Sequence, residues 1–251
     1  MEIIAVNRDN ITTEHICCAI SDKKGECCVS SKKEWMIKRF EDGLVFKKLD
    51  VRGKVFIEYI PASKAWYPIS ADGYMHINCF WVSGQFKGKG FANRLLEQCM
   101  EDAKNAGLLG VTVISSPKKM PFLSDPGYLK YKGFKTADTA APHYELLYLP
   151  FDESAPAPKF SDCAKKGRIE EKGMVLYYTN QCPHTAKYVP VIQDIAEERG
   201  MALSIHKIET LEEAKNAPSP FTTYSFFYDG TFVTNEIFSE KKFEKFLDTI
   251  C

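Results

Sequence analysis

The feature that most constrains this chain is the junction of a strand pattern with a helix pattern in residues 74–99, YMHINCFWVSGQFKGKGFANRLLEQC. Its apolar first part predicts a strand, and in its last part apolar residues recur with the spacing of one helix face. Gly88 and Gly90 stand between them with Lys87 and Lys89. Such a turn presents backbone N–H groups and the positive end of a helix dipole to one point, which attracts an anion such as a pyrophosphate. An ordinary tight turn with solvated lysines is the alternative.

The charge balance of the chain limits the classes of partner. Lys plus Arg and Asp plus Glu number 33 each, so no net field draws the protein to nucleic acid or to an anionic membrane. No apolar run approaches the roughly 18 residues that a membrane helix needs, and residues 1–10 lack a signal-type pattern. We therefore expect a cytoplasmic protein whose partners include neither nucleic acid nor a membrane.

The nine cysteines follow neither the spacing of a disulfide framework nor that of a metal knuckle. The pairs Cys17-Cys18 and Cys27-Cys28 lack the C-x-x-C spacing, and adjacent side chains on a strand point to opposite faces of a sheet. We expect reduced cysteines and no metal, with a metal site at these pairs as the alternative.

The composition divides the chain into three parts. Residues 152–172 are rich in proline and charge and poor in branched apolar residues, which is typical of a linker or exposed connector. Residues 1–151 alternate strand and helix patterns, and residues 173–251 begin a second, smaller α/β pattern. We therefore predict an α/β (α+β) protein of two domains. The elements expected in the first are strands over 44–50, 54–62, 74–82, 110–116 and 144–151 and helices over 34–43, 91–106 and 128–134.

The run Gln85-Phe86-Lys87-Gly88-Lys89-Gly90 resembles the Q-x-x-G-x-G/A loop of the GNAT superfamily of acyl-CoA N-acyltransferases. The strand before it, the helix after it and the later segments GVTVISS and YLKYKGF are similar to the order of that family over about residues 56–149. The stretch INCFWVSGQFKGKG and the second part of the chain resemble the YoaP-like acetyltransferases. The resemblance implies a mixed, mostly antiparallel sheet flanked by helices, with acetyl-CoA as the co-substrate.

The resemblance also implies which residues bind the coenzyme. Main-chain amides of the loop would hold the pyrophosphate, and the end of the preceding strand would pair with the pantetheine arm. The residues so implied are Phe80, Trp81, Val82, Gln85, Phe86, Lys87, Gly88, Lys89, Gly90 and Phe91. The strand over 110–115 would splay away to make room for the thioester. The reaction would be direct attack of an amine on the acetyl carbonyl, which requires a base and an acid.

Two residues are candidates for the base. Strand alternation places Glu58 on the face of Phe56 and Ile60, where partial burial of a carboxylate would raise its pKa towards neutrality. A solvent-facing glutamate or a salt bridge to a lysine is the alternative for Glu58. His76 on the next strand is the second candidate, and a histidine that is satisfied by packing is its alternative.

The acid is harder to assign because the chain departs from the family pattern. Members of the family often carry a tyrosine four residues before the glycine of the Gly-Phe pair, and here that position is Leu129. Tyr128 and Tyr131 flank it and are the candidates for the acid. Aromatic packing would explain both equally well, and an acid supplied by water, or no dedicated acid, stays open.

Residues 174–250 resemble the thioredoxin-like fold, with Cys182 at the start of the first helix pattern. A thiol at a helix N-terminus has a lowered pKa, which makes Cys182 a candidate reactive thiolate. Thr185 stands where a resolving cysteine would be, so dithiol chemistry within one chain is not expected. A scaffold that serves only recognition or dimerisation is the alternative.

The leading interpretation is an acetyl-CoA-dependent N-acetyltransferase that acts on an amine of a small molecule or peptide. Two other classes stay open. One is a catalytically silent acyl-CoA-binding sensor, which the missing tyrosine favours, and the other is a monothiol redox or thiol-transfer protein that acts through Cys182. A homodimer also stays open.

Overall fold

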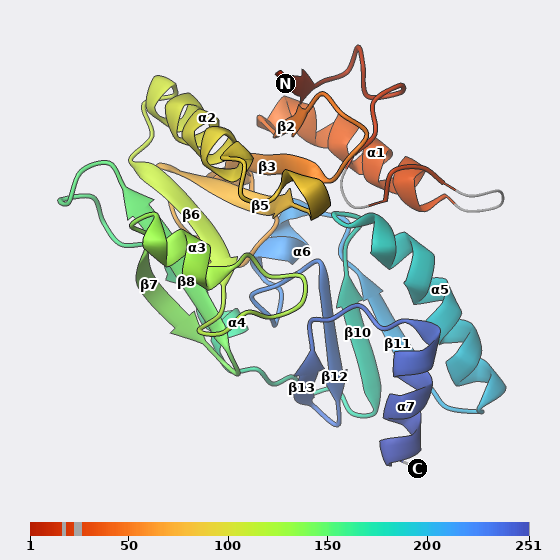
Figure 1. Cartoon of the computed structure of the whole chain (residues 1–251). Helices are drawn as coiled ribbons and strands as arrows, with labels where there is room; N and C mark the ends of the chain where they lie inside the picture. Colours follow the sequence, from red (N-terminus) through yellow and green to blue (C-terminus); the bar gives the residue numbers. More distant parts are fainter. Residues whose placement is uncertain (17–18, 23–26, 251) are drawn as a thin grey trace.

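The structure is a computed structural model that describes residues 1–16, 19–22 and 27–250. Its centre is a seven-stranded sheet, shown in Figure 1. The strands in spatial order are β1 (Ile3–Val6), β2 (Val45–Leu49), β3 (Val55–Pro61), β5 (Tyr74–Val82), β6 (Gly110–Ser115), β8 (Tyr144–Pro150) and β7 (Lys135–Ala140). All neighbours are antiparallel except β5 and β6, so the expected mixed, mostly antiparallel sheet is confirmed.

The sequence patterns did not predict the two outer strands, β1 and β7. β7 has the sequence KTADTA, which contains no large apolar residue and no alternation, and β1 has four residues. Each pairs with one neighbour among the described strands. β7 has no apolar face of its own, so its pairing with β8 holds it in place, whereas β1 is apolar but too short to show an alternation.

Helices cover both faces of this sheet. α2 (Phe91–Asn105) and α3 (Pro126–Tyr131) lie on one face, and α1 (Cys28–Arg39) lies on the other (Figure 1). The alternation predicted for β3 is confirmed, because Val55, Ile57 and Tyr59 belong to the core under α2, and Phe56 and Ile60 belong to the core under α1. Cys28 opens α1, so the prediction that the pair Cys27-Cys28 lies on a strand is wrong, whereas Cys17-Cys18 lies outside the described residues.

The pairing between β5 and β6 ends part-way along both strands. Parallel pairing joins Tyr74–Ile77 to residues 110–113 and then stops. Residues 79–82 of β5 continue on β3 alone, and Ile114 and Ser115 continue on β8 alone, so the sheet splays open here. A register shift next to Tyr59 leaves Asn78 as an extra residue in β5, which is the geometry of a β-bulge.

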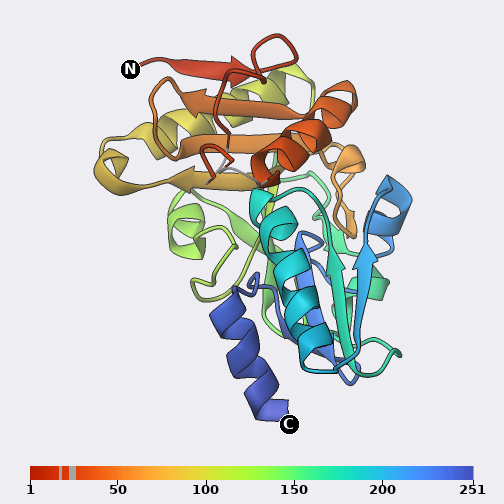
Figure 2. The same ribbon diagram turned by 90° about the vertical axis from the view of Figure 1, so that its right-hand side faces the viewer.

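The second half of the chain forms a four-stranded sheet with two long helices beside it. The spatial order is β11 (Leu203–Lys207), β10 (Met174–Tyr178), β12 (Tyr224–Tyr228) and β13 (Thr231–Thr234). α5 (Pro183–Glu198) and α7 (Glu240–Ile250) pack against the same face of it, as Figures 1 and 2 show. β10 is parallel to β11 and antiparallel to β12. The resemblance to the thioredoxin-like fold stays a prediction.

The connector between the halves packs against the first half. β9 (Lys159–Phe160) pairs with β4 (Ile69–Ser70), and the side chains of Phe160 and Ala164 are buried. The remaining short elements are η1 (Phe40–Asp42), η2 (Ala62–Lys64), η3 (Gly84–Phe86), α4 (Asp162–Lys165) and α6 (Leu211–Lys215). The connector is therefore partly ordered into the core, while the domain boundaries themselves stay a prediction.

The two halves share one hydrophobic core. Trp66 and Tyr67 of the first half belong to the same buried cluster as Phe221 and Phe227 of the second. Lys215 of α6 reaches across, and its Nζ donates to the carbonyl oxygen of Ala62 at 2.9 Å and to that of Ile69 at 3.4 Å. Burial lowers the pKa of Lys215 to about 8.

A buried ion pair ties α1 to the middle of the sheet. Lys32 Nζ lies 2.6 Å from Glu58 Oε2, and both side chains are almost wholly excluded from solvent. Lys32 Nζ also lies 4.3 Å from the centre of the Trp35 ring. Desolvating both charges is costly, so such a pair tolerates the loss of both charges better than the loss of one.

We expect Glu58→Gln and Lys32→Met each to lower the free energy of unfolding by about 3 kcal/mol, because each leaves the other charge buried without its counter-ion. The double variant should lose less than either single variant does. Urea unfolding of the four proteins forms a double-mutant cycle, and additive losses would contradict the coupling.

The lowered pKa of Lys215 predicts a pH dependence of stability. Between pH about 8 and about 10.4 the unfolded chain binds a proton at Lys215 that the folded chain does not, so the free energy of unfolding rises with pH over that window. Urea unfolding at pH about 7.5 and about 9.5 should show a larger increase for the wild type than for Lys215→Met. An equal increase in the two proteins would contradict this.

Candidate active site

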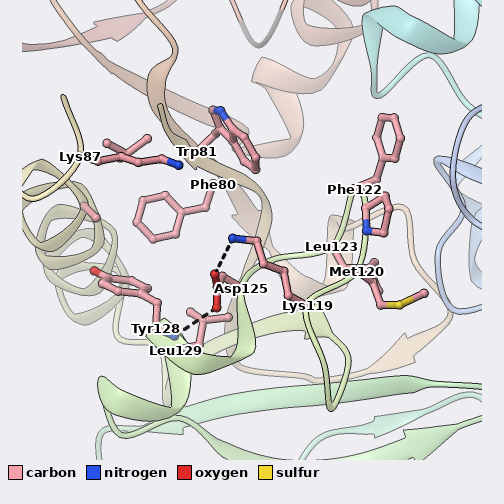
Figure 3. A pocket seen from close by; sticks show the side chains of 13 residues that line it. Phe80, Trp81, Lys87, Lys119, Met120, Phe122, Leu123, Asp125, Tyr128 and Leu129 are labelled. Carbon is pink, nitrogen blue, oxygen red and sulfur yellow. Dashed lines mark hydrogen bonds and ion pairs between the residues drawn. The ribbon is translucent and has the colours of Figure 1, made fainter. Parts of the chain in front are cut away.

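A cleft of about 620 Å³ opens where β5 leaves β6. It is bounded by the end of β5, the start of α2, the loop over 119–125 and α3 (Figure 3). Its lining residues are Phe80, Trp81, Val82, Lys87, Ala92, Lys119, Met120, Pro121, Phe122, Leu123, Asp125, Tyr128 and Leu129. The volume is within the range of about 300–1,000 Å³ that is typical of small-molecule and cofactor sites.

The glycine loop carries the backbone geometry of an anion site. Gly88 and Gly90 have φ of +72° and +79°, and a Cβ built on either would meet no atom within 4 Å. Within residues 27–250, the amide N–H groups of Gly88, Lys89, Gly90 and Phe91 donate to no protein acceptor, and no side chain caps the start of α2. An anion placed here would therefore find unsatisfied donors and the positive end of the helix dipole.

Not every residue implied for coenzyme binding reaches the cleft. Phe80, Trp81, Val82 and Lys87 line it. Gln85 and Lys89 are exposed outside its wall. Phe86 and Phe91 are buried and pack ring against ring with their centres 6.2 Å apart, so their side chains anchor the loop to the core. The amides of Phe86 and Lys87 already donate to Ser83 and Gly84 carbonyls, which leaves the later amides of the loop for a ligand.

The far wall of the cleft comes from the loop over 119–125, which no sequence pattern had singled out. Asp125 caps α3 through its Oδ1 and contacts Lys119 Nζ at 3.0 Å through its Oδ2, as Figure 3 shows. Contact with Lys119 first, and the amides of α3 second, hold the pKa of Asp125 below its ordinary value. Phe122 has φ of +64°, a strained value for a non-glycine residue. Strain of this kind gathers at functional sites.

The structure separates the two candidate acids. Tyr128 lies in the cleft with its ring against Phe80, and its hydroxyl donates to Asn93 Oδ1 at 3.1 Å. Burial raises the pKa of Tyr128 to about 12. Tyr131 is 84% exposed and lies outside the cleft, while Leu129 packs in the core beneath α3. Only Tyr128 is therefore placed to meet a ligand in the cleft.

The two candidate bases have different surroundings. His76 is enclosed, with Nδ1 2.9 Å from Thr112 Oγ1 on the paired part of β6, and burial lowers its pKa to about 3. It packs against the ring of Tyr67 and is not among the residues that line the cleft, and its role as a base stays a prediction. Glu58 lies beside the bulge of β5, where Oε1 accepts from Asn78 Nδ2 at 3.1 Å and Oε2 contacts Lys32.

A second, smaller cavity of about 50 Å³ lies between the two halves, next to the first. Glu58, Asn78 and Cys79 line it from the sheet, and Gln181 and Cys182 line it from the start of α5. Its other lining residues are Tyr67, Phe122, Pro183, Phe221 and Thr223. Phe122 thus belongs to the walls of both cavities. The structure therefore places Cys182 opposite the candidate base Glu58.

Two general features of the described residues complete the description. None of their helices combines the length and the apolar character that crossing a bilayer would require. Among them, no three His, Cys, Asp or Glu side chains gather as a metal ion would need.

Comparisons with known proteins agree with the geometry. A family model described as "Acetyltransferase (GNAT) family" matches residues 11–119, and one described as "YoaP-like" matches residues 203–245. The chain is 44% identical over 247 residues to the "Uncharacterized N-acetyltransferase YoaP" of Bacillus subtilis (strain 168), a match that covers 98% of each chain.

Solved structures are more distantly similar. The PaiA N-acetyltransferase of Thermoplasma acidophilum in complex with coenzyme A matches at 15% identity and TM-score 0.40, over 60% of this chain and 100% of that one. A GNAT family acetyltransferase of Brucella melitensis in complex with acetyl-CoA matches at 16% identity and TM-score 0.38, over 62% of this chain and 90% of that one. Because identity of 44% with the Bacillus protein extends over nearly the whole chain, this chain belongs to the GNAT acetyltransferase family, as a YoaP-like N-acetyltransferase.

Proposed function

We propose that this N-acetyltransferase moves the acetyl group of acetyl-CoA to an amine by direct attack within the splay between β5 and β6. The observation that carries the proposal is the cleft itself, with unsatisfied loop amides at one end and a strand that ends its pairing at the other. The acetyl-CoA thioester supplies the electrophilic carbonyl, and the residues of the chain bind it, orient it and move the protons.

The loop and the strand divide the binding of acetyl-CoA between them. The open space above Gly88 and Gly90 lets a pyrophosphate approach the main-chain amides closely, and Lys87 adds charge on the cleft side. The part of β5 after Asn78 has a neighbour on β3 and none on β6. An extended pantetheine arm fits this free edge in the way that a peptide adds to a sheet.

We assign Tyr128 as the acid that donates a proton to the departing thiolate. Its raised pKa, which burial causes, keeps the hydroxyl protonated at any pH below about 12. The hydroxyl donates to Asn93 Oδ1 in the structure, so it turns from that oxygen to reach a thiolate in the cleft. A general acid in such a position contributes a rate factor of about 10² to 10⁴.

We assign Glu58 as the base that removes the proton of the attacking amine, directly or through a water molecule. Glu58 is the carboxylate nearest the bulge of β5, and it lines the smaller cavity beside the cleft. Lys32 contacts Oε2 of Glu58. The other oxygen, Oε1, which accepts from Asn78, is therefore the one that we assign to accept the proton. Amine and thioester would then approach from the two sides of the splay.

Replacing Gly88 by leucine tests the coenzyme site. The side chain would occupy the space above the loop amides and strain a backbone with φ of +72°, so we expect the Kd for acetyl-CoA to rise about 100-fold. Isothermal titration calorimetry measures this. Gly200→Leu is the matched control, because Gly200 has φ of +66°, has equally open space and ends α5 far from the cleft. Equal affinity of the two variants would overturn the assignment.

Replacing Tyr128 by phenylalanine tests the acid. We expect kcat to fall about 100-fold with the Kd for acetyl-CoA unchanged, because the ring still packs on Phe80 while the proton is lost. Thiol release in steady state measures kcat. Tyr131→Phe removes the same atom from an exposed site and should behave as the wild type. A Tyr128→Phe enzyme with full kcat would show that water or another group protonates the thiolate.

A further inference from the structure

Two residues that line the small cavity between the halves, Gln181 and Asn78, each carry a buried side-chain oxygen that lacks a hydrogen-bond donor within the described part of the chain. Gln181 is 7% exposed, and its Oε1 has no hydrogen-bond partner among the described residues. The same holds for Oδ1 of Asn78 on the opposite wall. A buried amide oxygen without a donor is destabilising, so two of them on residues that line one cavity point to a ligand that brings N–H or O–H groups.

The hydrogen-bond network determines which atom of each amide is the oxygen. The hydroxyl of Thr222 donates its only proton to the Trp66 carbonyl, so it can only accept from Gln181 Nε2, at 3.2 Å. Asn78 Nδ2 donates to Oε1 of Glu58, whose other oxygen is paired with Lys32. In both side chains the nitrogen therefore donates a hydrogen bond, and the oxygen accepts none from the described residues.

The charge at the cavity indicates the form in which a ligand is held. Glu58 is the carboxylate in the lining of the cavity and is balanced by Lys32, and the two amide oxygens are neutral, so no carboxylate among the described lining residues is left over to hold a permanent cation. An ammonium that enters this largely apolar space is desolvated, which lowers its pKa and favours the neutral amine. A neutral primary amine donates two N–H groups and keeps the lone pair that attacks a carbonyl.

The size of the cavity limits the shape of that amine. A volume of about 50 Å³ leaves room for the head of an amine, so we expect a slender, unbranched stem to enter more readily than one that is branched beside the nitrogen. Phe122, with its strained backbone, is the wall that this cavity shares with the large cleft. An amine in the small cavity therefore lies next to the cleft assigned to the thioester.

We propose that the cavity between the halves is the acceptor site, that it takes the head of an unbranched primary amine, and that Gln181 of the second half selects it. The inference rests on the proposed acetyl transfer and adds the position and the class of the acceptor. It also gives the second half of the chain a role, as the wall that completes the site opposite β5.

The test uses the full chain, acetyl-CoA and two probe amines, n-butylamine and tert-butylamine, with thiol release as the readout. We expect kcat/KM for n-butylamine to exceed that for tert-butylamine at least tenfold. Gln181→Leu should raise the KM for n-butylamine about tenfold, because one buried acceptor is lost, and should leave the Kd for acetyl-CoA unchanged. Cys182→Leu fills the cavity without touching the Gln181 hydrogen bonds and should abolish transfer to both amines.

Gln193→Leu is the matched control, since Gln193 is an exposed glutamine of α5, and it should retain the wild-type KM. A thermal unfolding transition shows that each variant is folded. If Gln181→Leu does not fold, Cys182→Leu still tests the inference. An unchanged KM in Gln181→Leu, equal use of the two amines, or no transfer by protein that binds acetyl-CoA would overturn the acceptor site. Failure to bind acetyl-CoA would instead overturn the proposed function.

Discussion

The rest of this structure depends on one constraint: β5 and β6 pair over only part of their length. Two parallel strands that pair over residues 74–77 and 110–113 and then part leave two unpaired backbone edges inside a sheet. Elsewhere such edges would invite aggregation or would be covered. Here β3 and β8 hold the two strands apart, the large cleft opens on the side of α2, and the small cavity opens on the side of α5. Both cavities exist because one ladder stops.

The second half of the chain covers the gap that opens beside the end of β5. Its residues around Gln181 and Phe221 approach the parted end of β5, and its sheet buries one face against the first half. In Figure 2, α5 and α7 lie in front of the smaller sheet, and the start of α5 lies close to α1. This arrangement places Cys182 at the same cavity as Glu58, Asn78 and Cys79 of the larger sheet, and its reactivity stays a prediction.

Local patterns were enough to predict the parts of the site that lie close together in the sequence. The strand over 74–82, the glycine loop and the helix from Phe91 lie where their apolar periodicity and glycines indicate. The facing of Glu58 also followed from simple alternation. Its partner did not, because Lys32 lies on a helix whose position depends on tertiary packing. The same holds for Gln181, which reaches the site only through the shared core.

The choice between Tyr128 and Tyr131 shows another limit. α3 has six residues, too few for an apolar period to define which side faces the sheet, so both tyrosines fitted the pattern. The cap at Asp125 and the core contact of Leu129 set the rotation of the helix, and both depend on a loop without a recognisable motif. His76 is similar, since its pairing with Thr112 depends on where the β5–β6 ladder ends.

The common core has a consequence for how the protein is made. Trp66 and Tyr67 emerge from the ribosome long before Phe221, Phe227 and Phe232, which cover them in the finished molecule. At a synthesis rate of about 5–20 residues per second, this aromatic surface stays uncovered for roughly 8 to 30 seconds. The nascent N-terminal half therefore exposes an aromatic surface of the kind that chaperones recognise. Its folding is complete only after translation has reached the hairpin of β12 and β13.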